Sequence, residues 1–385
     1  MLKKIGEFFD VILNPVQTVP VGSYQLQGDR EGQLPYRLNL RVEPDGTGIL
    51  IIDASTVLHL NRTATDYAYH LVQHTPPEET ARLIAERYNV SPEQAQQDFA
   101  DFTERINTLV HTTDLDPVTY LDMERVEPYS RKLRAPYRLD CALTYQVSGN
   151  SKKDAAPTER VSRELSTQEW YAILEKSSSV GIPHVVFTGG EPTLREDLPD
   201  LISKTEELGI VSGLLTDGLR FIDPTYVKTV LTSGLDHIML LCDPDDSRFW
   251  VALHNLMAGD IAVTVHFTLT AQNQEQAASI LQKLANGDVR SLSLSAADPA
   301  LEDALFVLQD IAQHIGFSLV WDLPVPYSNC NPIALELKNS PLTSQKGSRT
   351  WLYVEPDGDV LPEQGVNRVL GNILNDPWYS IWKKR

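Results

Sequence analysis

The stretch Val185–Leu194, V-V-F-T-G-G-E-P-T-L, decides the fold that we predict for this chain. An apolar run ends at Thr188–Gly190, and Glu191 and Pro192 follow. That order predicts a buried strand whose C-terminal end enters a tight glycine turn. Glycine lets a ligand approach bare backbone, and the adjacent carboxylate suits an amine or another cation. An ordinary strand-to-helix turn explains the same residues equally well, so both interpretations stay open at this point.

A second short motif makes the pattern more specific. The segment F-T-G-G-E-P-T-L is followed one strand later by T-D-G at Thr216–Gly218, and together they resemble the radical S-adenosylmethionine (SAM) family. In that family the G-G-E-P turn holds the amino group of SAM, and T-N-G closes the next strand. The resemblance covers residues 136–295 and implies a cofactor site at the C-terminal ends of parallel strands. The cofactor-binding residues that it implies are Gly189, Gly190, Glu191, Pro192, Thr216, Asp217, Gly218 and Asp243.

The composition sets broad limits on the protein class. The chain has 385 residues, enough for two or three domains, and its net charge of −19 disfavours binding to nucleic acid or to acidic membranes. No apolar run reaches the ~20 residues of a membrane helix, and the N-terminus lacks the pattern of a signal peptide. We therefore expect a cytoplasmic protein. The cysteines Cys141, Cys242 and Cys330 are far apart and form no C-x-x-C pair, which argues against a disulfide framework.

Residues 1–110 predict a small α+β domain, although the pattern supports no assignment for residues 1–34. The expected strands lie at 36–42, 49–53 and 57–60, and the expected helices at 63–73, 78–88 and 92–110. Strands followed by a helix–turn–helix resemble the winged-helix-like PqqD-like peptide chaperone domain of pyrroloquinoline quinone biosynthesis. The resemblance implies that a leader peptide adds a strand to an open sheet edge. We expect that edge at Tyr36–Val42 or Ile49–Asp53.

Two other interpretations of this domain compete with peptide recognition. A DNA-binding winged helix is disfavoured, because the third expected helix carries several acids and Arg105 as its single arginine. Such a helix would repel the phosphate backbone. The second alternative is a small packing domain without a ligand.

After a predicted linker at 111–135, strand and helix signals alternate six times. The expected strands lie near 137–144, 183–188, 210–215, 236–242, 261–268 and 289–294, and the expected helices near 167–178, 197–208, 224–232, 246–257, 273–286 and 300–315. This alternation predicts an α/β fold with parallel strands. The family resemblance implies the open, partial (β/α)6 barrel of radical SAM proteins over residues 136–322.

The loop after the first of these strands departs from the family pattern. In the family it carries C-x-x-x-C-x-x-C, whose thiolates hold an iron–sulfur cluster. Aligned on L-T-Y-Q at Leu143–Gln146, the three cysteine positions hold Val147, Ser151 and Asp154. Valine has no donor atom, serine replaces cysteine poorly, and aspartate is a hard oxygen ligand. We therefore predict that the iron–sulfur cluster is absent, and that the remaining cysteines are small core residues.

Residues 323–385 resemble the SPASM-type extension of peptide-modifying radical SAM enzymes, in which P-D-G-x-V-x-P-C and L-G-N-I recur. Here the segment Pro356–Pro362 is followed by Glu363 at the position of the cysteine, and L-G-N-I stands at Leu370–Ile373. The auxiliary cluster is therefore predicted to be absent as well.

Two functional hypotheses follow from these patterns. The first is a non-catalytic radical SAM homologue that binds a peptide or a protein, such as a leader peptide or an active radical SAM paralogue. The second is a SAM-binding enzyme with different chemistry or with unforeseen cluster ligands. We favour the first, because the cofactor carries the radical chemistry and a fold without it has no mechanism. Weak residual binding of SAM at the strand ends is still expected.

Overall fold

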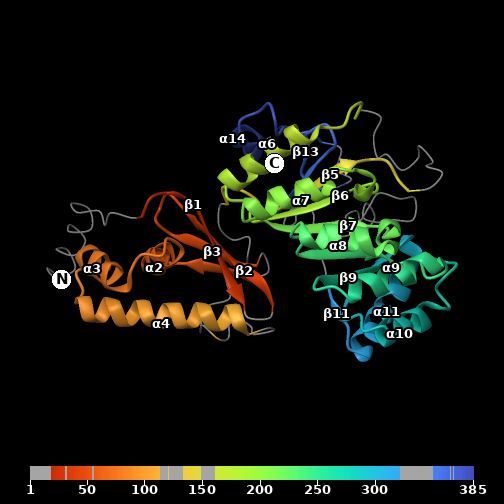
Figure 1. The fold of residues 1–385 in the computed structure, drawn as a ribbon, viewed down its shortest axis with the longest axis horizontal. Helices are drawn as coiled ribbons and strands as arrows, with labels where there is room; N and C mark the ends of the chain where they lie inside the picture. Colours follow the sequence, from red (N-terminus) through yellow and green to blue (C-terminus); the bar gives the residue numbers. More distant parts are fainter. Residues whose placement is uncertain are drawn as a thin grey trace. The chain divides into compact units, whose positions relative to one another are not determined.

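The computed structural model describes residues 19–30, 33–53, 56–112, 120, 133–148, 161–320, 350–364, 366 and 368–385. The chain divides into two compact units, Met1–Ser130 and Arg131–Arg385, and each is described by itself (Figure 1). Ser151, Asp154, Cys330 and the part of the SPASM-like segment before Thr350 lie outside the described residues.

The first unit is built on an antiparallel sheet in the order β1-β2-β3-β4. Its strands are β1 Gly22–Arg30, β2 Gln33–Val42, β3 Gly48–Ile52 and β4 Thr56–Leu60. The last three match the predicted strands. Strand β1 is an additional one, in which Tyr24 and Leu26 supply the alternating apolar side chains that pack on the core.

This additional strand changes which backbone edges are open. Strand β2 pairs with β1 on one side and with β3 on the other, and β3 pairs with β2 and β4. The expectation that a guest strand adds at Tyr36–Val42 or Ile49–Asp53 is therefore wrong, because these segments already make their ladder hydrogen bonds inside the sheet. The outer strands of this sheet are β1 and β4.

Three helices follow the sheet and close its core. They are α2 Arg62–Val72, α3 Pro77–Tyr88 and α4 Pro92–His111, close to the predicted bounds. Asn61 caps α2 by accepting the Ala64 N–H at 2.9 Å, and Ser91 caps α4 by accepting the Gln94 N–H at 3.2 Å. Ile106 of α4 belongs to the same buried cluster as the apolar face of the sheet.

The second unit contains a sheet in the order β11-β10-β9-β8-β7-β6-β5-β12-β13-β14. Its strands are β5 Arg138–Thr144, β6 His184–Gly189, β7 Val211–Thr216, β8 His237–Leu241, β9 Ala262–Leu269, β10 Ser291–Ala296, β11 Ser318–Leu319, β12 Trp351–Val354, β13 Asp359–Leu361 and β14 Gly371–Asn372. Strands β5 to β10 pair in parallel and in sequence order, which confirms the predicted alternation. Strand β12 joins the sheet parallel to β5 and turns back into β13.

Helices connect these parallel strands, as Figure 1 shows. They are α6 Thr167–Ser179, α7 Leu198–Glu207, α8 Pro224–Thr232, α9 Ser247–Met257, α10 Ala277–Asn286 and α11 Glu302–Ile315, with α14 Trp378–Lys383 near the C-terminus. Short 3-10 turns, η2 Pro192–Leu194 and η3 Leu219–Ile222, follow β6 and β7. Large side chains such as Trp170 and Phe249 are fully buried. The unit is thus an α/β structure around a parallel sheet.

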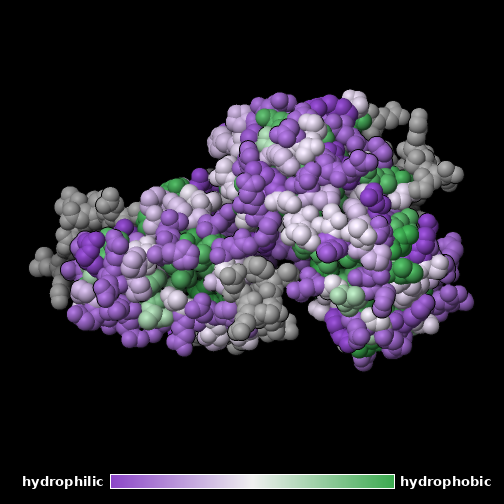
Figure 2. All heavy atoms as spheres, in the orientation of Figure 1, coloured by the Kyte–Doolittle hydropathy of each residue, from purple (hydrophilic) through white to green (hydrophobic). Residues whose placement is uncertain are grey.

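The face of the protein drawn in Figure 2 is mainly polar. Hydrophilic side chains cover most of the face seen in Figure 2, and hydrophobic ones gather there only in small patches. This agrees with the net charge of −19. Within the described parts of the chain, no helix is long and apolar enough to cross a membrane.

Candidate functional site

The glycine turn after β6 lies against the segment that follows β5. The N–H of Gly190 donates to the Thr144 carbonyl at 2.8 Å, and the N–H of Glu191 donates to the Gln146 carbonyl at 2.7 Å. A Cβ on Gly189 would lie 2.1 Å from the Thr144 oxygen, and one on Gly190 would lie 2.0 Å from the Gln146 oxygen. Gly189 also has a φ of +123°, which side chains rarely adopt. The packing of the chain itself therefore requires both glycines.

The carboxyl group of Glu191 joins this turn to the end of β7. It is 2% exposed. Its Oε1 accepts the Thr193 N–H at 3.0 Å and lies 2.5 Å from the Thr193 hydroxyl and 2.8 Å from the Thr216 hydroxyl. Its Oε2 accepts the Asp217 N–H at 2.7 Å. Polar groups of the protein thus occupy both oxygens, and the side chain connects two strand ends.

Burial raises the pKa of Glu191 to about 8, and the nearby Asp217 carboxyl group contributes to this rise as the second-largest cause. The protonated form is therefore populated at neutral pH. Its O–H can donate to the Thr193 or Thr216 hydroxyl, while the two oxygens continue to accept the backbone N–H groups. Glu191 is consequently a cross-link whose negative charge is largely suppressed at neutral pH.

The other predicted cofactor residues lie around this cross-link. Pro192 is buried at the start of η2. Gly218 has a φ of +81°, a conformation that favours glycine. Asp243 follows β8, and no hydrogen bond between described residues joins its side chain to Glu191 or Asp217. Pro192 and Gly218 therefore have roles in the chain's own packing, and the role of all three positions in cofactor binding stays a prediction.

The segment after β5 is the place where the family carries its cluster cysteines. Arg195 holds the two ends of this segment, because its Nη1 donates to the Leu143 carbonyl at 3.4 Å and to the Leu165 carbonyl at 2.9 Å. A bidentate pair with Asp197, at 2.9 and 2.7 Å, orients the guanidinium. Val147 lies in the described part of the segment and offers no donor atom to a metal.

The two cysteines that the structure describes, Cys141 and Cys242, do not form a common ligand set. Cys141 lies fully buried in β5, and Cys242 follows β8, so that β6 and β7 separate them in the sheet. Burial raises the pKa of both thiols and disfavours the thiolate that a cluster needs. Glu363, at the position of the auxiliary-cluster cysteine, is also buried, which raises its pKa. The described residues therefore do not fit an iron–sulfur cluster.

A polar row that the sequence analysis missed crosses one face of the parallel sheet. The Nε2 atoms of His184 in β6 and His237 in β8 lie 2.7 Å apart in a hydrogen bond. Gly213 of the intervening β7 makes room for this bond, because a Cβ there would lie 2.2 Å from the His237 ring. Arg138 and Asp140 of β5 form a bidentate pair at 2.6 and 3.1 Å. Burial lowers the pKa of both histidines, that of His237 to about 4, so the pair is neutral at neutral pH.

A second polar group lies on β9 and β10. His266 is 2% exposed, and its Nδ1 and Nε2 each lie 3.0 Å from a hydroxyl, of Ser293 and Ser295 respectively. The Thr268 hydroxyl lies 3.2 Å from the same Nε2. The signal in the sequence is the alternation S-L-S-L-S-A at 291–296, since strands buried on both faces usually read as continuous apolar runs.

Three carboxyl groups gather at the β12–β13 hairpin. Oxygens of Glu355, Asp357 and Asp359 lie within 4.8 Å of one another. Tyr145 donates to Glu355 at 3.1 Å, and Asn372 donates to Asp359 at 3.0 Å. Acidic turns commonly adopt this arrangement without an ion, and no other described feature of the hairpin points to a metal.

Comparison with known proteins gives partial matches in sequence and broad matches in fold. No protein-family model matches the chain. A PqqA peptide cyclase of Granulibacter bethesdensis is 27% identical over 138 residues, which are 32% of this chain and 37% of that protein. A PqqA peptide cyclase of Gluconobacter oxydans is 40% identical over 82 residues, which are 21% and 23% of the two chains. The matches thus span well under two thirds of these relatives' lengths.

Among solved structures, Streptococcus suis SuiB shares the fold with a TM-score of 0.59 at 16% identity, over 95% of this chain and 88% of SuiB. SuiB bound to its precursor peptide SuiA gives a TM-score of 0.56, also at 16% identity, over 93% and 88% of the chains. Likeness at this identity concerns the fold alone. The chain is therefore similar to PqqA peptide cyclases over part of its length and shares its overall fold with SuiB.

Proposed function

We propose that this chain is a non-catalytic radical SAM homologue that binds a peptide or a partner protein. In this proposal residues 1–110 are a PqqD-like recognition domain, residues 136–322 a partial (β/α)6 barrel, and residues 323–385 a SPASM-derived extension. The observation that carries the proposal is the identity of the three cluster positions, Val147, Ser151 and Asp154.

The chemistry of the two described thiols supports this proposal. Cys141 and Cys242 are buried in different parts of the sheet, and their raised pKa values oppose ionisation. Reductive cleavage of SAM needs an electron from the cluster and an iron site that holds the substrate, so a chain without the cluster has no route to that reaction. Binding functions need neither.

A peptide is the favoured partner because the proteins that this chain resembles are named for peptides or have been solved with one. The matched relatives are named PqqA peptide cyclases, and SuiB has been solved with its precursor peptide SuiA. A leader peptide encoded nearby is the first candidate, and an active radical SAM paralogue is the second. The net charge of −19 favours a neutral or basic guest, since an acidic segment would be repelled during approach.

Iron and acid-labile sulfide content after anaerobic reconstitution tests the proposal. We expect no stoichiometric iron in the natural chain after gel filtration. The matched control is the triple variant Val147→Cys/Ser151→Cys/Asp154→Cys, which restores the family's C-x-x-x-C-x-x-C spacing and is expected to retain iron. Iron and sulfide that co-elute in stoichiometric amounts with the natural chain would refute the proposal.

A further inference from the structure

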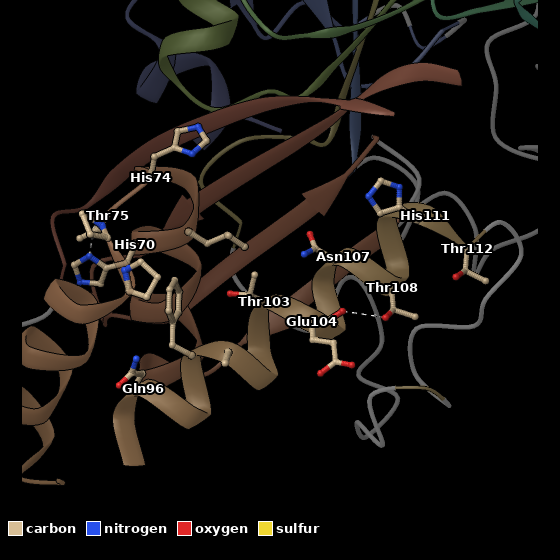
Figure 3. Close-up of a pocket in the computed structure, with 15 residues that line it drawn as sticks. His70, His74, Thr75, Gln96, Thr103, Glu104, Asn107, Thr108, His111 and Thr112 are labelled. Atoms are coloured by element: carbon tan, nitrogen blue, oxygen red, sulfur yellow. Dashed lines mark hydrogen bonds between the residues drawn. The ribbon is translucent and has the colours of Figure 1, made fainter. Parts of the chain in front are cut away.

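A groove of about 900 Å³ lies in the first unit, between α4 and the turn from α2 to α3 (Figure 3). Its lining comes from the end of α2, the turn at 74–76, the start of α3 and one side of α4 from Gln96 to His111. No strand contributes to this lining, so the groove is separate from the edges of the sheet. Figure 3 shows Thr103 and Asn107 projecting from the same side of α4.

The groove follows α4 along most of its length. Its lining runs from Gln96 to His111 at helical spacing. With a rise of ~1.5 Å per residue, this stripe is ~22 Å long. An extended chain rises ~3.3 Å per residue, so about seven residues of an extended peptide cover it. The shape therefore suits a peptide segment better than a compact small molecule.

The walls of the groove are poor in charge. Glu104 is its single carboxylate, and Figure 3 shows that side chain pointing away from Thr103 and Asn107. Burial lowers the pKa of His70, and the Arg87 charge lowers it further against the opposing effect of Asp66 and Glu79, so the imidazole is neutral at neutral pH. A groove without a fixed positive charge does not select an anion.

Two buried polar atoms in the groove have no hydrogen-bond partner among the described residues. His70 is 4% exposed; its Nδ1 lies 3.1 Å from the Thr75 hydroxyl, whereas its Nε2 has no hydrogen bond. The Thr103 hydroxyl is buried and is likewise unpaired. Buried polar groups are normally satisfied, and leaving one unpaired is costly. A guest that supplies amide N–H and carbonyl groups would satisfy both atoms.

The wall formed by the α2–α3 turn is preorganised. His74 has a φ of +52°, and its N–H donates to the Leu71 carbonyl at 3.1 Å. The Thr75 N–H donates to the His70 carbonyl at 2.9 Å, and two prolines follow. A wall that is already ordered costs little entropy when a guest binds.

We infer that this groove binds a short uncharged peptide segment in extended form, with its backbone amides at His70 and Thr103 and apolar side chains against Phe99 and Leu71. The inference rests on the proposed peptide-binding function and gives it a location on α4, away from the strand edges. The lining supports an uncharged guest, because it offers imidazole, amide and hydroxyl groups with a single carboxylate and so holds little charge to pair with a charged peptide.

The test uses the full-length chain and a phage-displayed library of random heptapeptides. The selected peptides are synthesised with a fluorescent label, and their affinities are measured by anisotropy. Ala100→Trp fills the groove from an exposed position of α4, and Gln94→Trp places the same side chain on another face of that helix as the matched control. We expect Ala100→Trp to weaken binding at least tenfold and Gln94→Trp to leave it within about twofold.

Thr103→Val is the second variant, and it separates binding from stability. It removes an unpaired buried hydroxyl at nearly constant shape, so urea unfolding is expected to show equal or higher stability. Peptide affinity is expected to fall by about 2- to 10-fold, the effect of one lost hydrogen bond. If neither Ala100→Trp nor Thr103→Val changed the affinity of the selected peptides, the groove would be refuted as the binding site, while peptide binding by the chain would still stand. A library that yields no binding peptide would overturn the groove and count against the proposed function as well.

Discussion

At the scale of single residues, Glu191 shows how a glycine-rich turn is stabilised from inside the protein. Its carboxyl group contacts Thr193 after β6 and both Thr216 and Asp217 at the end of β7. These backbone and hydroxyl donors lie at strand ends, where the sheet no longer satisfies them. The cross-link therefore holds together the two motifs on which the family resemblance rests.

The first prediction concerns Glu191→Gln and pH. The pKa of Glu191 rises from 4.5 to about 8 on folding, so the folded protein binds this proton more tightly than the unfolded chain does. Its stabilising contribution is complete below pH 4.5 and is lost as the pH rises through 8, with a slope of at most about 1.4 kcal/mol per pH unit. Urea unfolding should show the stability of the natural chain, relative to Glu191→Gln, falling across this range. A difference that stays flat or rises with pH would contradict a protonated Glu191.

The role of the two glycines could be predicted only in part from the sequence. The motif at 187–194 indicates a strand and a tight turn, and the structure has both. What occupies the space above Gly189 and Gly190 depends on Thr144 and Gln146, which are distant in sequence. The motif alone could not show why the glycines are needed. The reason is the backbone of the segment at Thr144–Gln146, which packs against them.

At the scale of elements, β9 and β10 carry a buried hydrogen-bonded group whose members are not equivalent. His266 Nδ1 contacts the Ser293 hydroxyl alone, whereas its Nε2 contacts both Ser295 and Thr268. Ser293→Ala should therefore leave an unpaired buried nitrogen, at a cost of about 1–3 kcal/mol. Ser295→Ala should cost about 1 kcal/mol or less, because Thr268 remains as a partner. Urea unfolding of the two variants measures the difference, and equal costs would refute this asymmetry.

Strand β7 supplies the third prediction, since Gly213 makes room for the His184–His237 hydrogen bond. A Cβ at this position would lie 2.2 Å from the His237 ring, so Gly213→Ala should destabilise the protein by about 1–3 kcal/mol. In a His237→Ala background the same substitution should cost about 0.5 kcal/mol or less. Gly287→Ala is the matched control, because its Cβ would meet only ordinary contacts at 3.4 Å and beyond. Thermal or urea unfolding would argue against steric exclusion if Gly213→Ala were no worse than the control.

Hydrophobic periodicity and capping residues explain why most elements could be predicted. Asn61, Ser91 and Ser166 each cap a helix where the sequence indicates a start. Strand β1 cannot be predicted from the sequence, because Tyr24 and Leu26 are too few apolar residues to establish a period. Without β1, the open edge of the sheet is expected at the wrong strand. The polar rows on β6 to β10 were missed because their partners come from different strands, and strand register is not readable from one segment.

At the scale of the whole molecule, the net charge of −19 leads to a prediction about nucleic acid. Helix α4 has the position of a recognition helix, yet it carries Glu93, Asp98, Asp101 and Glu104 with Arg105 as its single arginine. Neutralising phosphates requires lysine or arginine, so a short DNA duplex should not bind even at low salt. Fluorescence anisotropy with labelled DNA checks this, and saturable binding that weakens as salt is added would show that the prediction is wrong.

The division of the chain and the family resemblance were accessible from the sequence for different reasons. The units separate between Ser130 and Arg131, within the predicted linker at 111–135, where charged and proline residues interrupt the regular patterns. The family resemblance depends on short motifs at strand ends. The alternation of strand and helix signals alone does not identify a family. The groove along α4 could not be predicted, because it depends on how the α2–α3 turn packs beside that helix.

The proposed function requires that this chain hold no iron–sulfur cluster and therefore perform no radical SAM chemistry. Reductive cleavage of SAM yields methionine and, after hydrogen transfer, 5′-deoxyadenosine. The most direct measurement is therefore the 5′-deoxyadenosine formed when the anaerobically reconstituted chain is incubated with SAM and dithionite, quantified by mass spectrometry. We predict no product above a protein-free blank. Product that accumulates beyond one equivalent per chain would contradict the claim.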